Sequence, residues 1–185
     1  MKAFNSILVL VAAFIAVFAE AVISGPRHLL GAQIDLLPAL IIFAALNTNI
    51  VVVSLLAVFG GLWFDSLSAN PLGLTILPLF VVGFPIFLQR DLILRELPFA
   101  QVVLGGIASA VVPLLAVLLL LTAGQKPLLG WGSLWQWIIM TAGGAVATPV
   151  LFTLFEWCDD ALGYKPRVET SFRSDREILR DRKRM

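Results

Sequence analysis

Long runs of apolar residues alternate with short polar breaks along almost the whole chain. A helix that crosses the hydrocarbon core of a bilayer needs roughly 20 apolar residues, and most of the runs approach that length. The breaks contain the glycine, proline, asparagine and aspartate residues that end helices and form turns. The pattern predicts six helical spans, at about residues 5–24, 35–47, 50–66, 71–89, 98–123 and 133–157.

The first run has two interpretations. It follows Lys2 and contains the sequence Ala19-Glu20-Ala21, which is a potential cleavage site of a secretory signal peptide. However, the apolar part of a signal peptide usually has about 7 to 15 residues, and this run is longer, so we interpret it as a retained span. Cleavage would leave five spans and would not change the side on which the C-terminus lies.

The polar residues at 47–49 also allow two interpretations. They form either the turn of a tight helical hairpin or the middle of one long helix. Because three uncompensated polar side chains are costly in hydrocarbon, we expect the hairpin. Asp35 is placed to cap the second span, while Asn70 and Pro71 are placed at the N-cap and the first position of the fourth.

Composition places the chain among integral membrane proteins. Hydrophobic residues make up 59% of it and charged residues only 14%, whereas ordinary soluble domains have about 25% charged residues. We expect one transmembrane domain at residues 1–162 and a basic cytoplasmic tail at 163–185. One cysteine and one histidine cannot supply a four-ligand zinc site, so we expect no metal and no cofactor.

Basic residues predict the orientation, because the loops on the cytoplasmic side hold the excess of lysine and arginine. With both termini inside, eleven basic residues face the cytoplasm and only Arg27 and Lys126 face outward. The tail is either a basic helix on the anionic inner leaflet or a disordered anchor, with docking to a protein as a third option. Its candidate residues are Arg173, Arg176, Arg180, Arg182, Lys183 and Arg184.

Glu20, Asp65 and Glu156 are the acidic residues that could mark an ion or substrate pathway. All three lie near predicted helix ends, where a carboxylate also serves as a cap or an interfacial charge. Asp65 follows a strip of small residues, and it should be compensated by turn N–H groups or by the start of a neighbouring helix. The chain has no paired nucleophile and base and no glycine-rich phosphate loop, so we expect no enzymatic activity.

The segment Gly60-Gly61-Leu62-Trp63-Phe64-Asp65, followed by Pro71-Leu72-Gly73, resembles the Gly-x-x-x-Asp and Pro-Leu-Gly pattern of the bacterial rod shape-determining MreD family. The resemblance extends over the whole chain in length and in its six runs, but its specific part is about 15 residues. The basic tail and the glycine pairs in the last two spans depart from it. The candidate structural or partner-binding residues are Gly60, Gly61, Asp65, Asn70, Pro71 and Gly73.

The resemblance implies an all-α fold like that of the substrate-binding subunits of energy-coupling-factor transporters. It implies a non-enzymatic component of the cell-wall elongation (rod) complex in the bacterial inner membrane, which supports peptidoglycan synthesis. The implied partners are an MreC-like single-span protein, membrane lipids and, indirectly, an MreB-like filament and peptidoglycan synthases, with no nucleic acid. The similarity of fold leaves an alternative function, a membrane subunit of a transporter that binds a small, vitamin-type molecule.

Overall fold

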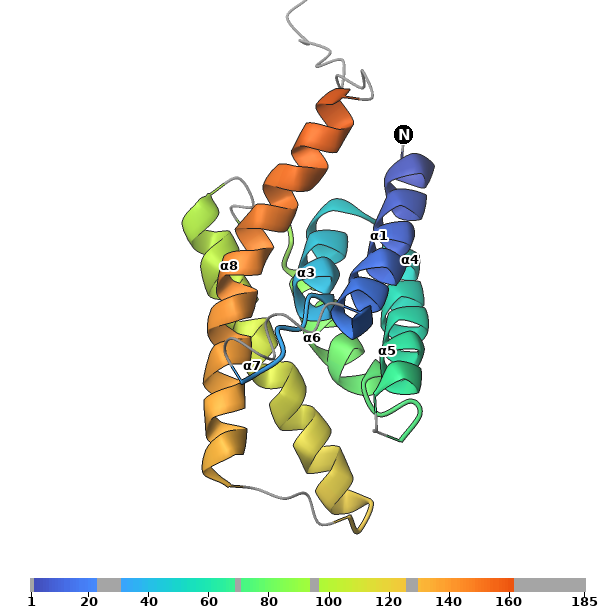
Figure 1. The fold of residues 1–185 in the computed structure, drawn as a ribbon. Helices are drawn as coiled ribbons and strands as arrows, with labels where there is room; N and C mark the ends of the chain where they lie inside the picture. The colour runs from blue at the N-terminus through green and yellow to red at the C-terminus, as the bar shows by residue number, and fades with distance from the viewer. Residues whose placement is uncertain (1, 23–30, 69–70, 94–96, 126–129, 162–185) are drawn as a thin grey trace, which may run out of the picture.

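The computed structural model describes residues 2–22, 31–68, 71–93, 97–125 and 130–161, without the side chains of 2–5 and 159–161. Every regular element in this part of the chain is a helix (Figure 1). Three stretches, Ile50–Leu67, Pro98–Thr122 and Trp131–Cys158, are long and apolar enough to cross a membrane. The elements are α1 (Lys2–Val22), α3 (Leu37–Asn47), α4 (Ile50–Leu55), η1 (Leu56–Gly60), α5 (Gly61–Leu67), α6 (Ile76–Leu88), α7 (Pro98–Thr122) and α8 (Trp131–Ala161).

The helices run alternately up and down through the molecule. In the view of Figure 1, α1 descends, α3 ascends, the continuous rod of α4, η1 and α5 descends, α6 ascends, α7 descends and α8 ascends. The start of α1 and the last turn of α8 therefore lie at the same end of the molecule. We refer to this as the terminal end. This arrangement is that of an α-helical membrane protein, as the composition predicts.

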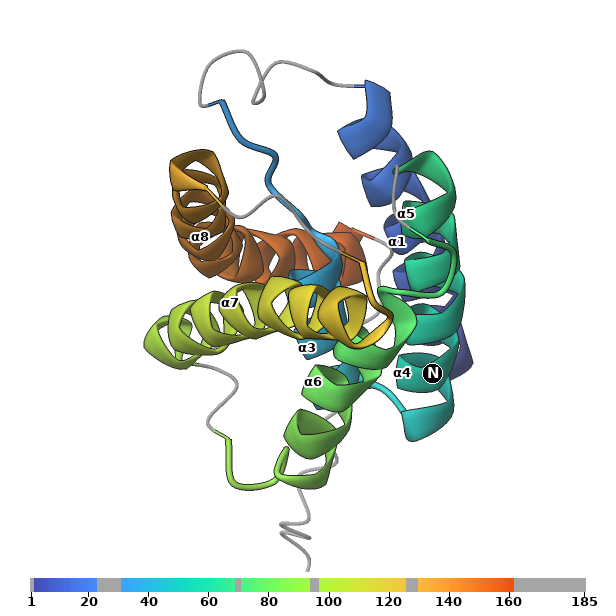
Figure 2. The ribbon, with the colours of Figure 1, turned by 90° about the horizontal axis from the view of Figure 1, so that it is seen from below.

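The short helix α3 forms the centre of the fold. Every residue from Leu37 to Leu46 is buried, and α3 contacts α1, α4, η1, α6, α7 and α8. Figure 2 shows it between α1, α4 and α5 on one side and α7 and α8 on the other. The Phe43 ring stacks on the Phe155 ring and packs edge to face against the Phe152 ring. These contacts join α3 to α8. An apolar helix that is buried on all sides has no amphipathic pattern.

Residues 48 and 49 separate α3 from α4, and the chain reverses direction there, so the predicted hairpin is confirmed. The next rod, predicted at 50–66, is helical throughout Ile50–Leu67 but contains the π-helical turn η1. A π turn introduces one extra residue into the helical register and often marks a site of functional or packing constraint. In this chain the π turn ends directly before Gly61, the residue at which α5 begins.

The predicted start of the fourth span is wrong. Pro71 was expected at the first helical position, but α6 begins at Ile76, and Pro71 begins a turn in which the Leu74 N–H donates to its carbonyl at 3.3 Å. Gly73 has φ +86°, a left-handed conformation that ends any helix beginning at Pro71. Asn70 lies outside the described residues. The other predicted helix ends agree with the structure to within a few residues, α8 being four residues longer than predicted at its C-terminal end.

Small residues, among them Gly105 and Ser109, allow α7 and α8 to cross closely. A Cβ atom on Gly105 would lie 2.6 Å from the carbonyl oxygen of Gly144, so only glycine fits at this crossing. The Trp137 indole N–H adds a hydrogen bond of 3.0 Å to the Ala110 carbonyl. Gly143 of α8 packs against the Ile34 side chain, which precedes α3.

Candidate functional site

Asp65 closes the junction between the third and fourth predicted spans. It lies at the end of α5, is only 1% exposed, and accepts the backbone N–H of Thr75 on Oδ2 at 3.0 Å. Its Oδ1 accepts the Thr75 hydroxyl. Because Thr75 is the N-cap of α6, the carboxylate faces the positive end of that helix dipole. Compensation by a neighbouring helix start, one of the two expected sources, is thus confirmed.

The two glycines before Asp65 allow close contacts with two different helices. A Cβ atom on Gly61 would lie 3.0 Å from the backbone nitrogen of Ile76 and 3.1 Å from its Cα. A Cβ atom on Gly60 would lie 3.1 Å from the Leu37 side chain. Gly61 thus brings α5 against the first turn of α6, while Gly60 brings η1 against α3.

The structure therefore places Gly61 and Asp65 against the start of α6, and the adjacent Gly60 against α3. We call this arrangement, together with Thr75, the glycine–aspartate junction. Pro71 and Gly73 form the turn that connects α5 to α6, and the Asp65 carboxylate bonds to Thr75 beyond that turn. Thr75, the partner of Asp65, was missed in the sequence because it lies inside the span predicted at 71–89, where a threonine gives no signal. Both oxygens of Asp65 bond to the protein itself, so the site is suited to fixing two helices rather than to acid–base chemistry.

Charged groups also lie at both ends of the central helix α3. At its N-terminus, Asp35 Oδ1 accepts the Leu37 N–H at 2.9 Å, as predicted, and Glu20 of α1 accepts the Leu36 N–H at 2.6 Å. At its C-terminus, Arg90 donates from Nη1 to the Thr48 carbonyl at 3.0 Å. Carboxylates at the start and a guanidinium at the end both complement the helix dipole. The roles of Glu20 and Arg90 were missed because each acts on a helix distant in sequence.

The transporter alternative requires polar side chains that converge near the predicted outer ends of the helices. The Ser66 hydroxyl donates to the Trp63 carbonyl at 2.7 Å, and the Ser68 hydroxyl donates to the Asp65 carbonyl at 3.3 Å. These hydroxyls thus satisfy the end of their own helix. The indole of Trp63 packs on Phe14 of α1, with ring centroids 4.7 Å apart. Such contacts fix α5 and do not by themselves prepare a ligand site.

The candidate residues of the basic tail, from Arg173 to Arg184, lie outside the described residues. Within the described part of the chain, no group of three or more histidine, cysteine, aspartate or glutamate residues is placed to hold a metal ion. Comparisons with models of protein families, with curated proteins and with solved structures find no match to this chain.

Proposed function

We propose that this chain is a non-enzymatic, multi-pass component of the bacterial cell-wall elongation complex, similar in role to the MreD family. In this proposal it has six membrane-embedded helical segments, lies in the inner membrane with both termini in the cytoplasm, and supports rod shape and peptidoglycan synthesis. Its direct partner is an MreC-like single-span protein, through which it reaches an MreB-like filament and the peptidoglycan synthases.

The glycine–aspartate junction is the observation that carries the proposal. It contains Gly60, Gly61 and Asp65, three of the residues on which the family resemblance rests. Each of them contacts a neighbouring helix or its N-cap, at Leu37, Ile76 and Thr75 respectively. Asp65 is 1% exposed, and both of its oxygens are used by Thr75. Because the residues of this motif are engaged in helix packing, they favour a scaffold role. The function of a scaffold depends on the shape that it presents to other proteins.

The placement of the ends supports the orientation. The start of α1 with Lys2 and the end of α8 lie at the terminal end, and so does Arg90, which bonds to the Thr48 carbonyl at the C-terminal end of α3. Positive residues concentrate on the cytoplasmic side of membrane proteins. The terminal end is therefore assigned to the cytoplasm in this proposal.

Exposed apolar side chains supply surfaces for a partner helix as well as for lipid. Phe18 of α1 is 54% exposed, and Val146 and Val150 of α8 are similarly exposed. Without a hydrophobic driving force in lipid, helix association depends on close packing. A rigid framework of crossing helices is a suitable platform for that packing.

The test is depletion of the chain in its own host, combined with affinity purification of the tagged full-length protein. We expect depleted cells to become round, and a single-span protein with a coiled-coil outer domain to co-purify with the tagged chain. Rod-shaped cells after complete depletion, together with loss of uptake of one vitamin, would refute the proposal and favour the transporter alternative.

A further inference from the structure

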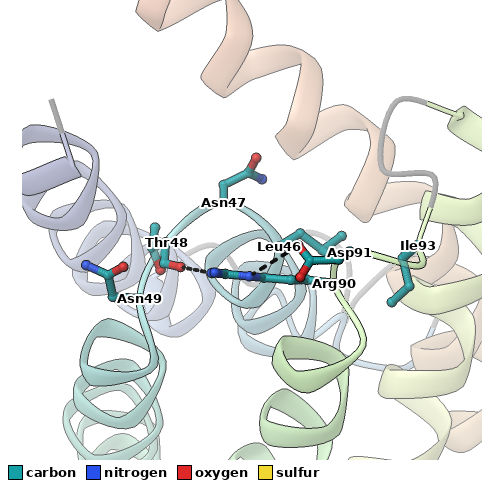
Figure 3. A pocket seen from close by; sticks show the side chains of 7 residues that line it. All are labelled: Leu46, Asn47, Thr48, Asn49, Arg90, Asp91 and Ile93. Atoms are coloured by element: carbon teal, nitrogen blue, oxygen red, sulfur yellow. Dashed lines mark hydrogen bonds and ion pairs between the residues drawn. The ribbon is translucent and has the colours of Figure 1, made fainter.

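A polar pocket of about 430 Å³ lies at the terminal end of the molecule, where α3 and α6 end and α4 begins. Its walls are the turn Asn47, Thr48 and Asn49 on one side, and Arg90 and Asp91 on the other (Figure 3). Three apolar helices end or begin at this point, so the pocket lies at the boundary between the hydrocarbon core and the layer of lipid headgroups and water.

Arg90 is held in a fixed position in this pocket. Its Nη1 donates to the Thr48 carbonyl at 3.0 Å, and its guanidinium carbon lies 4.6 Å from the centre of the Phe87 ring. The side chain is nevertheless 38% exposed. Since a guanidinium has five N–H donors and the Thr48 carbonyl takes one, donors remain for a ligand. An arginine that is already anchored loses little conformational freedom when it binds one.

Asp91 competes only weakly for the guanidinium. Its Oδ1 is 3.9 Å from Arg90 Nε, beyond hydrogen-bond distance, and its side chain is 93% exposed. Exposed ion pairs of this kind contribute little, because water screens them. Figure 3 shows the guanidinium between the Thr48 carbonyl and Asp91, so an anion with better geometry could replace the aspartate.

Two asparagine side chains form the rim of the opposite wall. Asn47 already donates from Nδ2 to the Phe43 carbonyl at 3.1 Å, which fixes its side chain at the pocket edge. Asn49 is exposed, and its amide makes no hydrogen bond within the described part of the chain. Figure 3 shows the Asn49 amide turned away from the Arg90 guanidinium, so Arg90 is the group that supplies the charge-assisted hydrogen bonds to a phosphate oxygen.

We propose that this pocket binds the phosphate group of an anionic phospholipid at the terminal end of the molecule. Arg90 supplies the charge-assisted hydrogen bonds, and the turn at 47–49 forms the wall against which the headgroup lies. A lipid is favoured over free phosphate because the pocket lies at the ends of apolar helices, where phospholipid headgroups are concentrated. This inference rests on the membrane class of the chain and is independent of the proposed role in cell-wall elongation.

The test is native mass spectrometry of the full-length protein in a neutral detergent, titrated with dioleoylphosphatidylglycerol. Dioleoylphosphatidylcholine and inorganic phosphate are titrated in parallel. We expect binding of phosphatidylglycerol in preference to phosphatidylcholine, and Arg90→Gln should weaken it roughly tenfold, the typical effect of losing a hydrogen bond to a charged group. Arg95→Gln is the control for net charge, because it removes one positive charge five positions further along the chain.

Asp91→Asn separates ligand binding from folding. It removes a competing carboxylate that is almost fully exposed, so it should leave the fold intact and tighten phosphatidylglycerol binding. Weaker binding in this variant would overturn the proposal, as would equal losses in the Arg90→Gln and Arg95→Gln variants or equal binding of the two lipids. Binding of inorganic phosphate that depends on Arg90, without binding of phosphatidylglycerol, would overturn the lipid as the source of the phosphate.

Discussion

Replacement of Asp65 by leucine tests the glycine–aspartate junction directly. Leucine has a similar size, but it accepts no hydrogen bond, so both bonds to Thr75 are lost. Thr75 is only 4% exposed, and its N–H would remain buried without its partner. A buried donor without a partner costs about 1–3 kcal/mol, and the favourable charge at the start of α6 is also lost. We expect a total loss of about 2–4 kcal/mol in the free energy of unfolding.

The measurement is the apparent Tm of the purified protein in detergent, followed by tryptophan fluorescence. For a chain of this size, 1 kcal/mol corresponds to roughly 2–4 °C, so Asp65→Leu should lower the apparent Tm by roughly 5–15 °C. Asp65→Asn is the matched variant. It keeps the shape and one acceptor oxygen and can donate to the Thr75 hydroxyl, so we expect about a third of the effect of leucine.

A double-mutant cycle with Thr75→Val identifies the partner. Valine removes the hydroxyl and keeps the backbone N–H, so the single variant should lose about 1 kcal/mol. Because the two side chains are in direct contact, the losses in Asp65→Leu and Thr75→Val should not add, and the coupling should be about 0.5–1 kcal/mol. An Asp65→Leu protein as stable as the wild type, or strictly additive losses, would refute the explanation of this junction.

Three further predictions concern helix packing. Gly105→Ala should lower the apparent Tm by several degrees, because the new Cβ meets the backbone of α8 at 2.6 Å. Gly106→Ala is the control, because its Cβ meets only a side chain at 3.5 Å. Similar shifts in the two variants would contradict the explanation by close helix crossing. Gly61→Ala should cost about 1–3 kcal/mol by the same measurement, because its Cβ meets the backbone of α6 at 3.0 Å. Asp65→Leu should lower the amount of the protein in membranes more than Glu20→Leu does, because Asp65 is buried and Glu20 is half-buried. The amount is measured by immunoblot, and equal levels of the two variants would contradict the prediction.

Some features of the site could be read from the sequence because they depend on neighbouring residues. The spacing of Ala57, Gly61 and Asp65 predicts one small-residue strip, and all three are buried in the structure. Asp35 caps the helix that follows it, as expected from its position two residues before the Leu37 N–H. Likewise, the turn at 47–49 follows from the cost of polar groups in hydrocarbon.

Other features depend on contacts between distant segments. The hydrogen bond from Arg90 to the Thr48 carbonyl joins residues 42 positions apart, so no local sequence pattern predicts it. The start of α6 at Ile76 depends on a carboxylate ten positions before Thr75, in the preceding helix. Propensity alone favoured Pro71 as the start, but the tertiary contact with Asp65 and the left-handed Gly73 decide the boundary.

The sequence by itself determined that the chain is helical, belongs in a membrane and turns at its polar breaks, because these properties follow from the length and composition of each run. Only the tertiary structure decided that α3 is the buried centre while α1, α7 and α8 present apolar side chains outward. The physical reason is that lipid and protein interior are both apolar. A run of leucine, isoleucine and alanine satisfies either environment. Whether a helix is buried in the protein or faces lipid therefore depends on close packing at positions such as Gly61 and Gly105. It also depends on which charged groups reach the ends of the central helix.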